Sequence, residues 1–410
     1  MRRSNIFFQK GILVLFIAAI LLPVYSQQKP YVVMLSLDGF RWDYAKKVAT
    51  PNFDYIAAHG VKAESLKPSF PTKTFPNHYS IVTGLYPGHH DIVLNGFYDP
   101  ETNRYYSISN RESLEDGSFY GGEPIWNTAE KQGIKTASFF WVGSEANIQG
   151  MRPDYWKVFD SQIPFGQRID TVVNWLQLPE KERPHLILCY MEEPDESGHD
   201  FGPDSKQVKQ KVSYLDSLVG VFTRKLNKLP VSNRINFIIV SDHGMTALSP
   251  SGTSYLYDYI NRSQLERGEG SNPVYFLDPK PESADSVYSA LKKAPHINVW
   301  WKKDLPERWH LGSSPRVLNL VVVADNGWQL KWDRESKLLN GDHGYDNNFR
   351  DMHGIFYAMG PAFRKDYVQP TFENVNIYNI ISFILGITPA KNDGIFEAVS
   401  PMLNKLSATK

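Results

Sequence analysis

Residues 31–40 have the sequence Tyr-Val-Val-Met-Leu-Ser-Leu-Asp-Gly-Phe. The nearly unbroken apolar run up to Leu37 is typical of a strand that is buried on both faces, as in a parallel sheet. The polar pair Asp38-Gly39 follows directly. Because ligands of open α/β sheets bind beyond the carboxyl ends of the strands, this stretch predicts both a fold class and a candidate site residue, Asp38.

Similar apolar runs at residues 185–190 and 235–240 predict two more buried strands. Helical stretches accompany the strands, at residues 42–59 with Pro51 interrupting, at 168–178 and at 205–229. Short apolar strands that alternate with helices indicate a mostly parallel sheet with helices on both faces, which is an α/β fold.

The segment from about residue 250 to 340 has a different pattern. Strand-like runs occur at residues 272–277, 298–301 and 318–323, and one helical stretch at 283–294. We expect a small α+β insertion here, and not a continuation of the main sheet.

The first residues carry a targeting signal. Arg2, Arg3 and Lys10 precede an apolar run at residues 11–22, which is too short to span a bilayer. We therefore expect residues 1–26 to be a secretory signal peptide, with an uncleaved N-terminal anchor as the alternative. After its removal we expect no transmembrane helix.

Charge and cysteine content exclude several classes of protein. The 44 basic and 44 acidic residues balance, which argues against a nucleic-acid-coating protein. The single cysteine, Cys189, excludes an intramolecular disulfide framework and a zinc–thiolate cluster. Export without disulfides suits a bacterial periplasm, so we expect a periplasmic or secreted protein. A metal site would have to use histidine and carboxylate ligands.

Such ligand types follow the predicted strands. The second strand leads into a segment with Asp195 and His199, the third into Asp242 and His243, and His343 follows the insertion. With Asp38 these make six candidate ligands. Carboxylates and imidazoles suit Zn²⁺, and six ligands are too many for one tetrahedral ion but fit two ions with open positions. Mn²⁺ and Co²⁺ stay alternatives.

A candidate nucleophile lies between the first two strands, in Pro71-Thr72-Lys73-Thr74-Phe75-Pro76. Pro76 fits the first turn of a helix, so Thr74 is expected just before a helix N-terminus, where negative charge is favoured. Thr74 could instead be only a helix cap, and Thr72 competes for either role. A threonine hydroxyl is a poor nucleophile unless a metal lowers its pKa.

Together these stretches resemble the nucleotide pyrophosphatase/phosphodiesterase family of the alkaline phosphatase superfamily. The resemblance runs from Tyr31 to about residue 390. It rests on the segments 37–40, 71–78, 83–87, 122–126, 190–199, 241–245 and 343–347, in that order. It implies an alkaline-phosphatase-like fold and a catalytic phosphodiesterase domain at residues 27–410.

The resemblance also implies residue roles. Asp195, His199 and His343 would bind one zinc ion. Asp38, Asp242, His243 and the Thr74 oxygen would bind the other. Thr74 would attack phosphorus and form a covalent phospho-threonine ester, and Asn95 would donate a hydrogen bond to a phosphate oxygen. Phe75, Phe159 and Tyr190 would line the substrate pocket; Phe159 replaces a tyrosine that is common in the family, and core packing is the alternative role for each aromatic.

The expected activity is cleavage of nucleotide phosphodiester or pyrophosphate bonds to nucleoside 5′-monophosphates. A diester monoanion needs less positive charge than a monoester dianion, and Asn95 is neutral while no arginine adjoins Thr74. The alternatives are a choline-lipid head-group phosphodiesterase acting on glycerophosphocholine, a phosphomonoesterase, or a non-enzymatic zinc- or nucleotide-binding surface protein. We expect a small-molecule partner and no stable nucleic-acid partner; the sequence does not set the oligomeric state.

Overall fold

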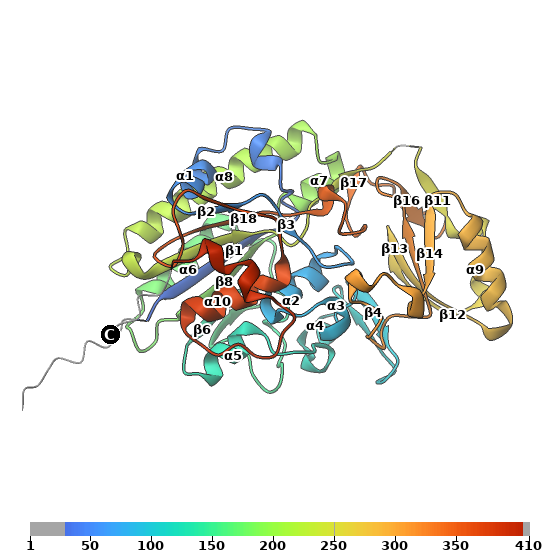
Figure 1. Ribbon diagram of the computed structural model, residues 1–410, viewed down its shortest axis with the longest axis horizontal. Coiled ribbons are helices and arrows are strands. Elements are labelled where there is room, and N and C mark those ends of the chain that lie inside the picture. Colours follow the sequence, from blue (N-terminus) through green and yellow to red (C-terminus); the bar gives the residue numbers. More distant parts are fainter. Residues whose placement is uncertain (1–28, 250, 405–410) are drawn as a thin grey trace, which may run out of the picture.

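The computed structural model describes residues 29–249 and 251–404. The predicted signal peptide, residues 1–26, lies outside the described residues. Figure 1 shows a large body of sheet and helices joined to a smaller lobe, drawn in yellow and orange, that carries its own sheet and helix α9. Among the described helices, none is long and apolar enough to cross a membrane.

An eight-stranded sheet organises the body. Its spatial order is β19 (Tyr367–Gln369), β2 (Val61–Ala63), β18 (Phe356–Met359), β9 (Ile235–Val240), β1 (Tyr31–Leu37), β8 (Leu186–Met191), β6 (Thr136–Phe139) and β7 (Tyr155–Lys157). The central strand β1 is parallel to β8 on one side and to β9 on the other. Only β18 runs antiparallel to its neighbours in this sheet, so the predicted mostly parallel sheet is confirmed.

Helices cover both faces of this sheet, as predicted. One face carries α1 (Pro51–His59), α6 (Phe165–Gln177) and α8 (Lys206–Asn227), and the other carries α2 (Thr74–Thr83), α5 (Ile125–Lys131) and α10 (Ile377–Leu385). Alternate residues of β1 pack into the two hydrophobic cores, one on each face of the sheet. Val33 and Leu35 pack with the first set, whereas Val32 and Met34 pack with the second. Successive side chains of a strand point to opposite faces, so a doubly covered strand must be apolar throughout.

One predicted helix is shorter than expected. Residues 42–50 contain only a 3₁₀ turn at Tyr44–Lys46, and α1 begins at Pro51. Proline has no N–H to donate and disfavours helical geometry in the residue before it. Thr50 accordingly has φ −130° and ψ 65°. Pro51 therefore starts a helix here and does not interrupt one.

The smaller lobe contains an antiparallel sheet in the order β12 (Leu265–Ser271), β13 (Val274–Pro279), β15 (Leu320–Ala324) and β14 (Ile297–Trp301), next to α9 (Ala284–Lys293). Val287 and Leu291 of α9 share a buried cluster with Leu320 and Val322 of β15. Two short strands, β10 (Thr246–Ala247) and β17 (Gly341–Asp342), pair with each other. The chain therefore leaves for this lobe and returns from it at adjacent points.

The remaining α-helices and strands are short. They are α3 (Pro87–His90), α4 (Arg111–Glu115), α7 (Asp195–Phe201), β3 (Leu66–Lys67), β4 (Gly96–Asp99), β5 (Arg104–Ser107), β11 (Thr253–Tyr255), β16 (Gln329–Lys331) and β20 (Phe372–Glu373).

Candidate active site

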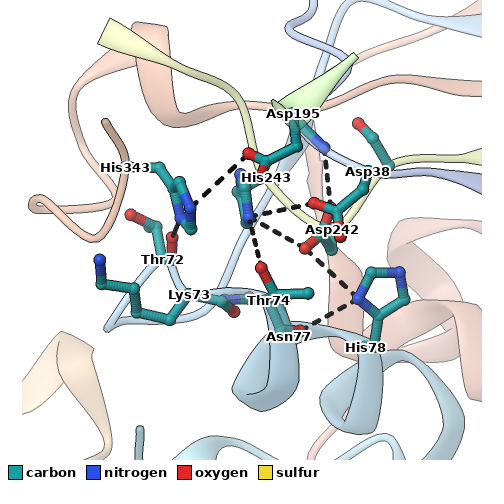
Figure 2. Close-up of polar contacts among 12 residues, drawn as sticks. Asp38, Thr72, Lys73, Thr74, Asn77, His78, Asp195, Asp242, His243 and His343 are labelled. Carbon is teal, nitrogen blue, oxygen red and sulfur yellow. Dashed lines mark hydrogen bonds and ion pairs between the residues drawn. The ribbon is translucent and has the colours of Figure 1, made fainter. Parts of the chain in front are cut away.

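Three neighbouring strands deliver the acidic site residues to one edge of the sheet. Asp38 follows β1 directly, Asp242 lies two residues beyond β9, and Asp195 begins α7 after β8. Because β8 and β9 flank β1 in parallel, their carboxyl ends lie side by side. Figure 2 shows the three carboxylates converging on one space.

Imidazoles approach these carboxylates closely. His243 Nε2 lies 3.0 Å from Asp242 Oδ2 and 3.4 Å from Asp38 Oδ1. On the other side, Asp195 has one carboxylate oxygen 3.3 Å from His199 Nε2 and the other 3.6 Å from His343 Nε2. Asp195, His199 and His343 form one group that could hold a metal ion, and Asp38, Asp195 and His243 form a second. The six predicted ligands therefore lie in one cluster.

Hydrogen bonds fix the orientation of the three histidine rings. In each ring Nδ1 faces a backbone carbonyl: His199 that of Gly341 at 2.9 Å, His243 that of Gly244 at 2.8 Å, and His343 that of Thr72 at 2.8 Å. A proton on Nδ1 leaves the lone pair of a neutral ring on Nε2. Metal-binding histidines commonly have this arrangement, because the second bond sets the tautomer and the ring position.

The carboxylates also fit bound cations. Asp38 Oδ1, Asp195 Oδ1 and Asp242 Oδ2 are buried and have no hydrogen-bond partner among the described residues. The second oxygen of Asp38 accepts from the Tyr190 hydroxyl at 2.6 Å, and that of Asp242 accepts from the Gly39 N–H at 3.2 Å. An unpartnered buried carboxylate oxygen costs free energy unless a positive charge neutralises it. Each of the three aspartates thus has one oxygen available as a ligand, as expected of a site that binds two divalent cations.

Electrostatics in the cluster point the same way. Burial, reinforced by Asp242 and Asp195, holds the pKa of Asp38 well above its ordinary value. Burial alone would lower the pKa of His199, but the Asp195 carboxylate outweighs it and raises this pKa to about 9. Burial and the His243 ring hold the pKa of His343 well below its usual range. Asp38 is thus buried beside two further carboxylates, an environment in which a bound cation is favoured.

His343 lies in the segment in which the chain returns from the smaller lobe to the body, and this segment brings it to the cluster. Asp342 in β17 pairs with Thr246 in β10, just after the strand-end segment that carries His243. The Thr72 hydroxyl accepts from the Gly344 N–H at 2.8 Å and donates to the Tyr345 carbonyl at 3.0 Å. Thr72 therefore holds the His343 loop, and its hydroxyl is not available as a nucleophile.

Thr74 takes a position different from the predicted one. It is the first residue of α2, and Lys73 is the N-cap residue, without a side-chain capping bond. Thr74 Oγ1 lies 3.2 Å from His243 Nε2, so it faces the cluster and caps no helix (Figure 2). The Lys73 ammonium turns away from Thr74 and donates to the Asn272 carbonyl at 2.6 Å, beside Asp342.

His78 is a site residue that the sequence reasoning missed. It lies one helical turn after Thr74, with Nδ1 3.0 Å from the Thr74 carbonyl oxygen and 3.3 Å from Asp242 Oδ2. Nε2 lies 2.8 Å from the Ser36 hydroxyl. Both ring nitrogens thus have polar neighbours in the protein, and His78 also forms a third group with Asp38 and Asp242 that could hold a metal ion. The spacing of four residues from Thr74 was the available signal, because such pairs share one helix face.

Asn95 lies next to the start of α2. Its Oδ1 accepts from the Phe75 N–H at 3.0 Å. The backbone carbonyl of Asn95 also accepts from the Ile108 N–H at 3.0 Å. No described residue pairs with the amide nitrogen of Asn95, which leaves two N–H donors for a ligand.

These residues border a cavity of about 490 Å³. Its wall includes Asp38, Thr74, Asp195, His199 and His343 together with Phe75, Asn95, Phe159 and Tyr190. The buried pair Asp242 and His243 does not line this cavity. Tyr190 therefore has two contacts, since its ring lines the cavity while its hydroxyl binds Asp38.

An arginine also reaches the cavity wall. This residue, Arg111, lines the cavity although it is distant from Thr74 in the sequence. Its guanidinium pairs with Glu115 and with Glu145. The absence of an arginine beside Thr74 in the sequence therefore does not make the whole cavity free of positive charge.

Comparison with known proteins identifies the family. The model for type I phosphodiesterase/nucleotide pyrophosphatase matches residues 32–346. The chain belongs to this family and is a phosphodiesterase, which confirms the resemblance seen in the sequence.

Individual relatives agree. The human ectonucleotide pyrophosphatase/phosphodiesterase family member 5 is 37% identical over 380 residues, covering 92% of this chain and 79% of the relative. A venom phosphodiesterase of Naja atra is 35% identical over 383 residues, which cover 91% of this chain but only 46% of the relative. A solved structure of the murine family member 5, an inactive variant with a threonine replaced by alanine in complex with AMP, has a TM-score of 0.88 and 35% identity. That match covers 92% of this chain and 100% of the structure.

Proposed function

We propose that this chain is an exported, metal-dependent hydrolase that cleaves nucleotide phosphodiester and pyrophosphate bonds and releases nucleoside 5′-monophosphates. The observation that carries the proposal is the Thr74 hydroxyl, 3.2 Å from His243 Nε2. It lies at the edge of an aromatic cavity, in the same cluster as three carboxylate oxygens that have no hydrogen-bond partner in the described part of the chain. Family membership and a relative solved with AMP support a nucleotide substrate.

Two divalent cations would complete the site. Asp195, His199 and His343 would hold one, and Asp38, Asp242 and His243 would hold the other with the Thr74 oxygen. Zinc suits this mixture of nitrogen and oxygen ligands. When bound, such a pair lowers the pKa of a coordinated hydroxyl and stabilises negative charge on the attacking and leaving oxygens.

Thr74 would act as the nucleophile. Its oxygen forms a bond to phosphorus while the bond to the departing alcohol or nucleotide breaks, which leaves a phospho-threonine ester. Water then cleaves that ester, releases the nucleoside monophosphate and restores the hydroxyl. The position of Thr74 at the start of a ten-residue helix helps, because the N-terminus of a helix favours negative charge. A relative that is described as inactive after a threonine-to-alanine substitution supports a catalytic threonine.

The other residues would bind the substrate. The free amide N–H groups of Asn95 can donate to a phosphate oxygen, while the bond from Phe75 N–H holds the side chain in place. Phe159, 44% exposed, and Phe75 present aromatic faces on which a nucleobase can stack. Phe159 offers the same ring face as the tyrosine that is common at this position in the family.

Replacing Thr74 tests the proposal. With zinc-loaded protein and a p-nitrophenyl ester of thymidine monophosphate, Thr74→Ala should lose at least about 1,000-fold in kcat and keep its zinc. Thr74→Ser is the matched control, since it retains a hydroxyl and should retain measurable turnover. Rapid acid quench and mass spectrometry should find a thymidine monophosphate group esterified to Thr74 of the wild-type protein. Undiminished turnover by Thr74→Ala would refute the nucleophile.

A substrate panel tests the proposed chemistry. Initial rates on dinucleotides, glycerophosphocholine and p-nitrophenyl phosphate should be highest for the nucleotide diesters, with nucleoside 5′-monophosphate as product. Preference for glycerophosphocholine or for the monoester would favour those alternatives. Binding of zinc and nucleotide without turnover of any ester would refute an enzymatic role.

A further inference from the structure

Arg316 of the smaller lobe reaches into the body of the protein. The segment that carries it connects β14 to β15, and the residue is only 6% exposed. Its guanidinium donates to the Asp91 carbonyl at 2.9 Å, to the Phe119 carbonyl, and to Asp99 Oδ2 at 2.9 Å. It also lies over the Phe97 ring, 5.0 Å from the ring centre. One side chain thus ties three backbone segments together.

Two of these bonds hold the two ends of the segment that carries Asn95. Asp91 ends α3 in the left-handed region, with φ 67°, and Asp99 is the last residue of β4. Asn95 lies midway, four residues from each. Figure 1 shows α3 and β4 at the junction between the body and the smaller lobe.

Neighbouring residues of the lobe strengthen the same contact. The Ser313 hydroxyl donates to the Gly88 carbonyl of α3 at 2.8 Å. A side chain at Gly88 would place its Cβ 2.2 Å from the His310 carbonyl oxygen, so the two backbones are in direct contact there. Residues 310–316 therefore press against α3 and the loop that follows it.

We propose that Arg316 is a positioning residue for the phosphodiesterase reaction: it holds the 91–99 segment so that the Asn95 amide stays aligned with Thr74. The inference rests on the proposed role of Asn95 as a phosphate donor. Catalytic hydrogen bonds are sensitive to position, and a displacement of about 1 Å can cost about 100-fold in rate. Arginine suits this task because its planar fork binds several oxygens at once in fixed directions, which a lysine ammonium cannot do.

A double-mutant cycle between Arg316 and Asn95 tests the proposal. The kcat on the p-nitrophenyl ester of thymidine monophosphate is measured at saturating zinc for wild type, Arg316→Lys, Asn95→Ala and the double variant. We expect Arg316→Lys to lower kcat about 10- to 100-fold and Asn95→Ala to lower it about 100- to 1,000-fold. In the double variant, Arg316→Lys should cost no more than about 2-fold beyond Asn95→Ala, because its effect passes through the lost amide. Losses that multiply would overturn the inference.

A matched control separates positioning from general destabilisation. Val322 is fully buried in the cluster of the smaller lobe that contains α9 residues. Val322→Ala should lower the melting temperature and leave kcat within about 2-fold of wild type. A similar loss of kcat in Val322→Ala would show that any weakening of the lobe suffices, and would also overturn the assignment.

A second variant keeps the test decisive if Arg316→Lys does not fold. Asp99→Asn removes the charge that Arg316 pairs with but keeps an acceptor oxygen, so the same cycle can be run with it against Asn95→Ala. Full turnover by Asn95→Ala itself would instead refute the proposed role of Asn95. The failure of the proposed function and the failure of the Arg316 assignment are therefore distinguishable.

Discussion

Replacing Tyr190 by phenylalanine should weaken metal binding while leaving the shape of the cavity intact. The Tyr190 hydroxyl donates to Asp38 Oδ2 at 2.6 Å, and the other oxygen of Asp38 is unpartnered among the described residues. Losing the hydroxyl leaves a buried carboxylate without its orienting donor. The ring, which lines the cavity, stays in place.

The size of the effect follows from that one bond. A hydrogen bond to an ionised acceptor contributes about 1.5–3 kcal/mol. At about 1.4 kcal/mol for each factor of ten, zinc should bind roughly 10- to 150-fold more weakly. This agrees with the roughly 10- to 100-fold losses that follow removal of residues supporting metal ligands. The KM for a nucleotide diester at saturating zinc should change little, since the stacking surface is retained.

Zinc titration against a chromogenic chelator measures this affinity directly. Tyr79→Phe is the matched control, because its buried hydroxyl donates to the Gly121 carbonyl at 3.0 Å and contacts none of the proposed ligands. Tyr79→Phe should bind zinc as wild type does. If Tyr190→Phe binds zinc within 2-fold of wild type, the argument that Tyr190 orients Asp38 is wrong.

Three further predictions concern the pocket, the core and the metal. Phe159→Ala should raise KM for a nucleotide diester about 5- to 150-fold, as expected for about 1–3 kcal/mol of lost base stacking. The KM for methyl p-nitrophenyl phosphate, which has no base, should stay within about 2-fold of wild type. Equal effects on both esters would contradict a stacking role. Burial lowers the pKa of His90 from 6.5 to about 3, and the ring is neutral because Nδ1 accepts from Ile92 N–H while Nε2 faces the Ser80 hydroxyl. Below pH 6.5 the unfolded chain therefore binds a proton at His90 that the folded chain does not bind, so lowering the pH from 7 to 5 costs about 2 kcal/mol of folding stability. The free energy of unfolding of His90→Gln, measured in urea, should lack this part of the pH dependence. If the free energy of unfolding changes equally with pH in both proteins, the role of His90 is refuted. Removing divalent ions with a chelator should lower the melting temperature, because ions that bind only the folded state add about 4 kcal/mol at 1,000 times their dissociation constant; calorimetry in which zinc leaves the melting temperature unchanged would count against the site.

Local sequence was sufficient for three strands of the main sheet and for the residues that follow them, whereas the shorter strands β2, β6, β7, β18 and β19 were not predicted. The apolar runs of β1, β8 and β9 are recognisable because a strand covered on both faces has to be apolar at every position. Asp38 and Asp242 were identifiable for a related reason, since polar residues that follow such strands fall at the edge where ligands bind. The order of the motifs added the family, which the comparisons confirmed.

The start of α1 and the position of Thr74 were less accessible to local reasoning. Pro51 and Pro76 both signal a first helical turn, but proline occurs at more than one position within that turn. In the structure Pro51 is the first residue of its helix and Pro76 the third of its own. Thr74 was therefore expected just before the helix, whereas it is the first residue of α2.

Only the tertiary structure decided how the remote segments that carry these groups are brought to the site. His343 reaches the cluster because β17 pairs with β10 after a long excursion of the chain. Asn95 accepts a hydrogen bond from the Phe75 N–H. Arg316 of the smaller lobe binds both ends of the 91–99 segment that carries Asn95. Periodicity and turn chemistry act over a few residues, so they specify strands and helix starts. Pairings between remote segments depend on how whole elements pack, and no local pattern encodes that.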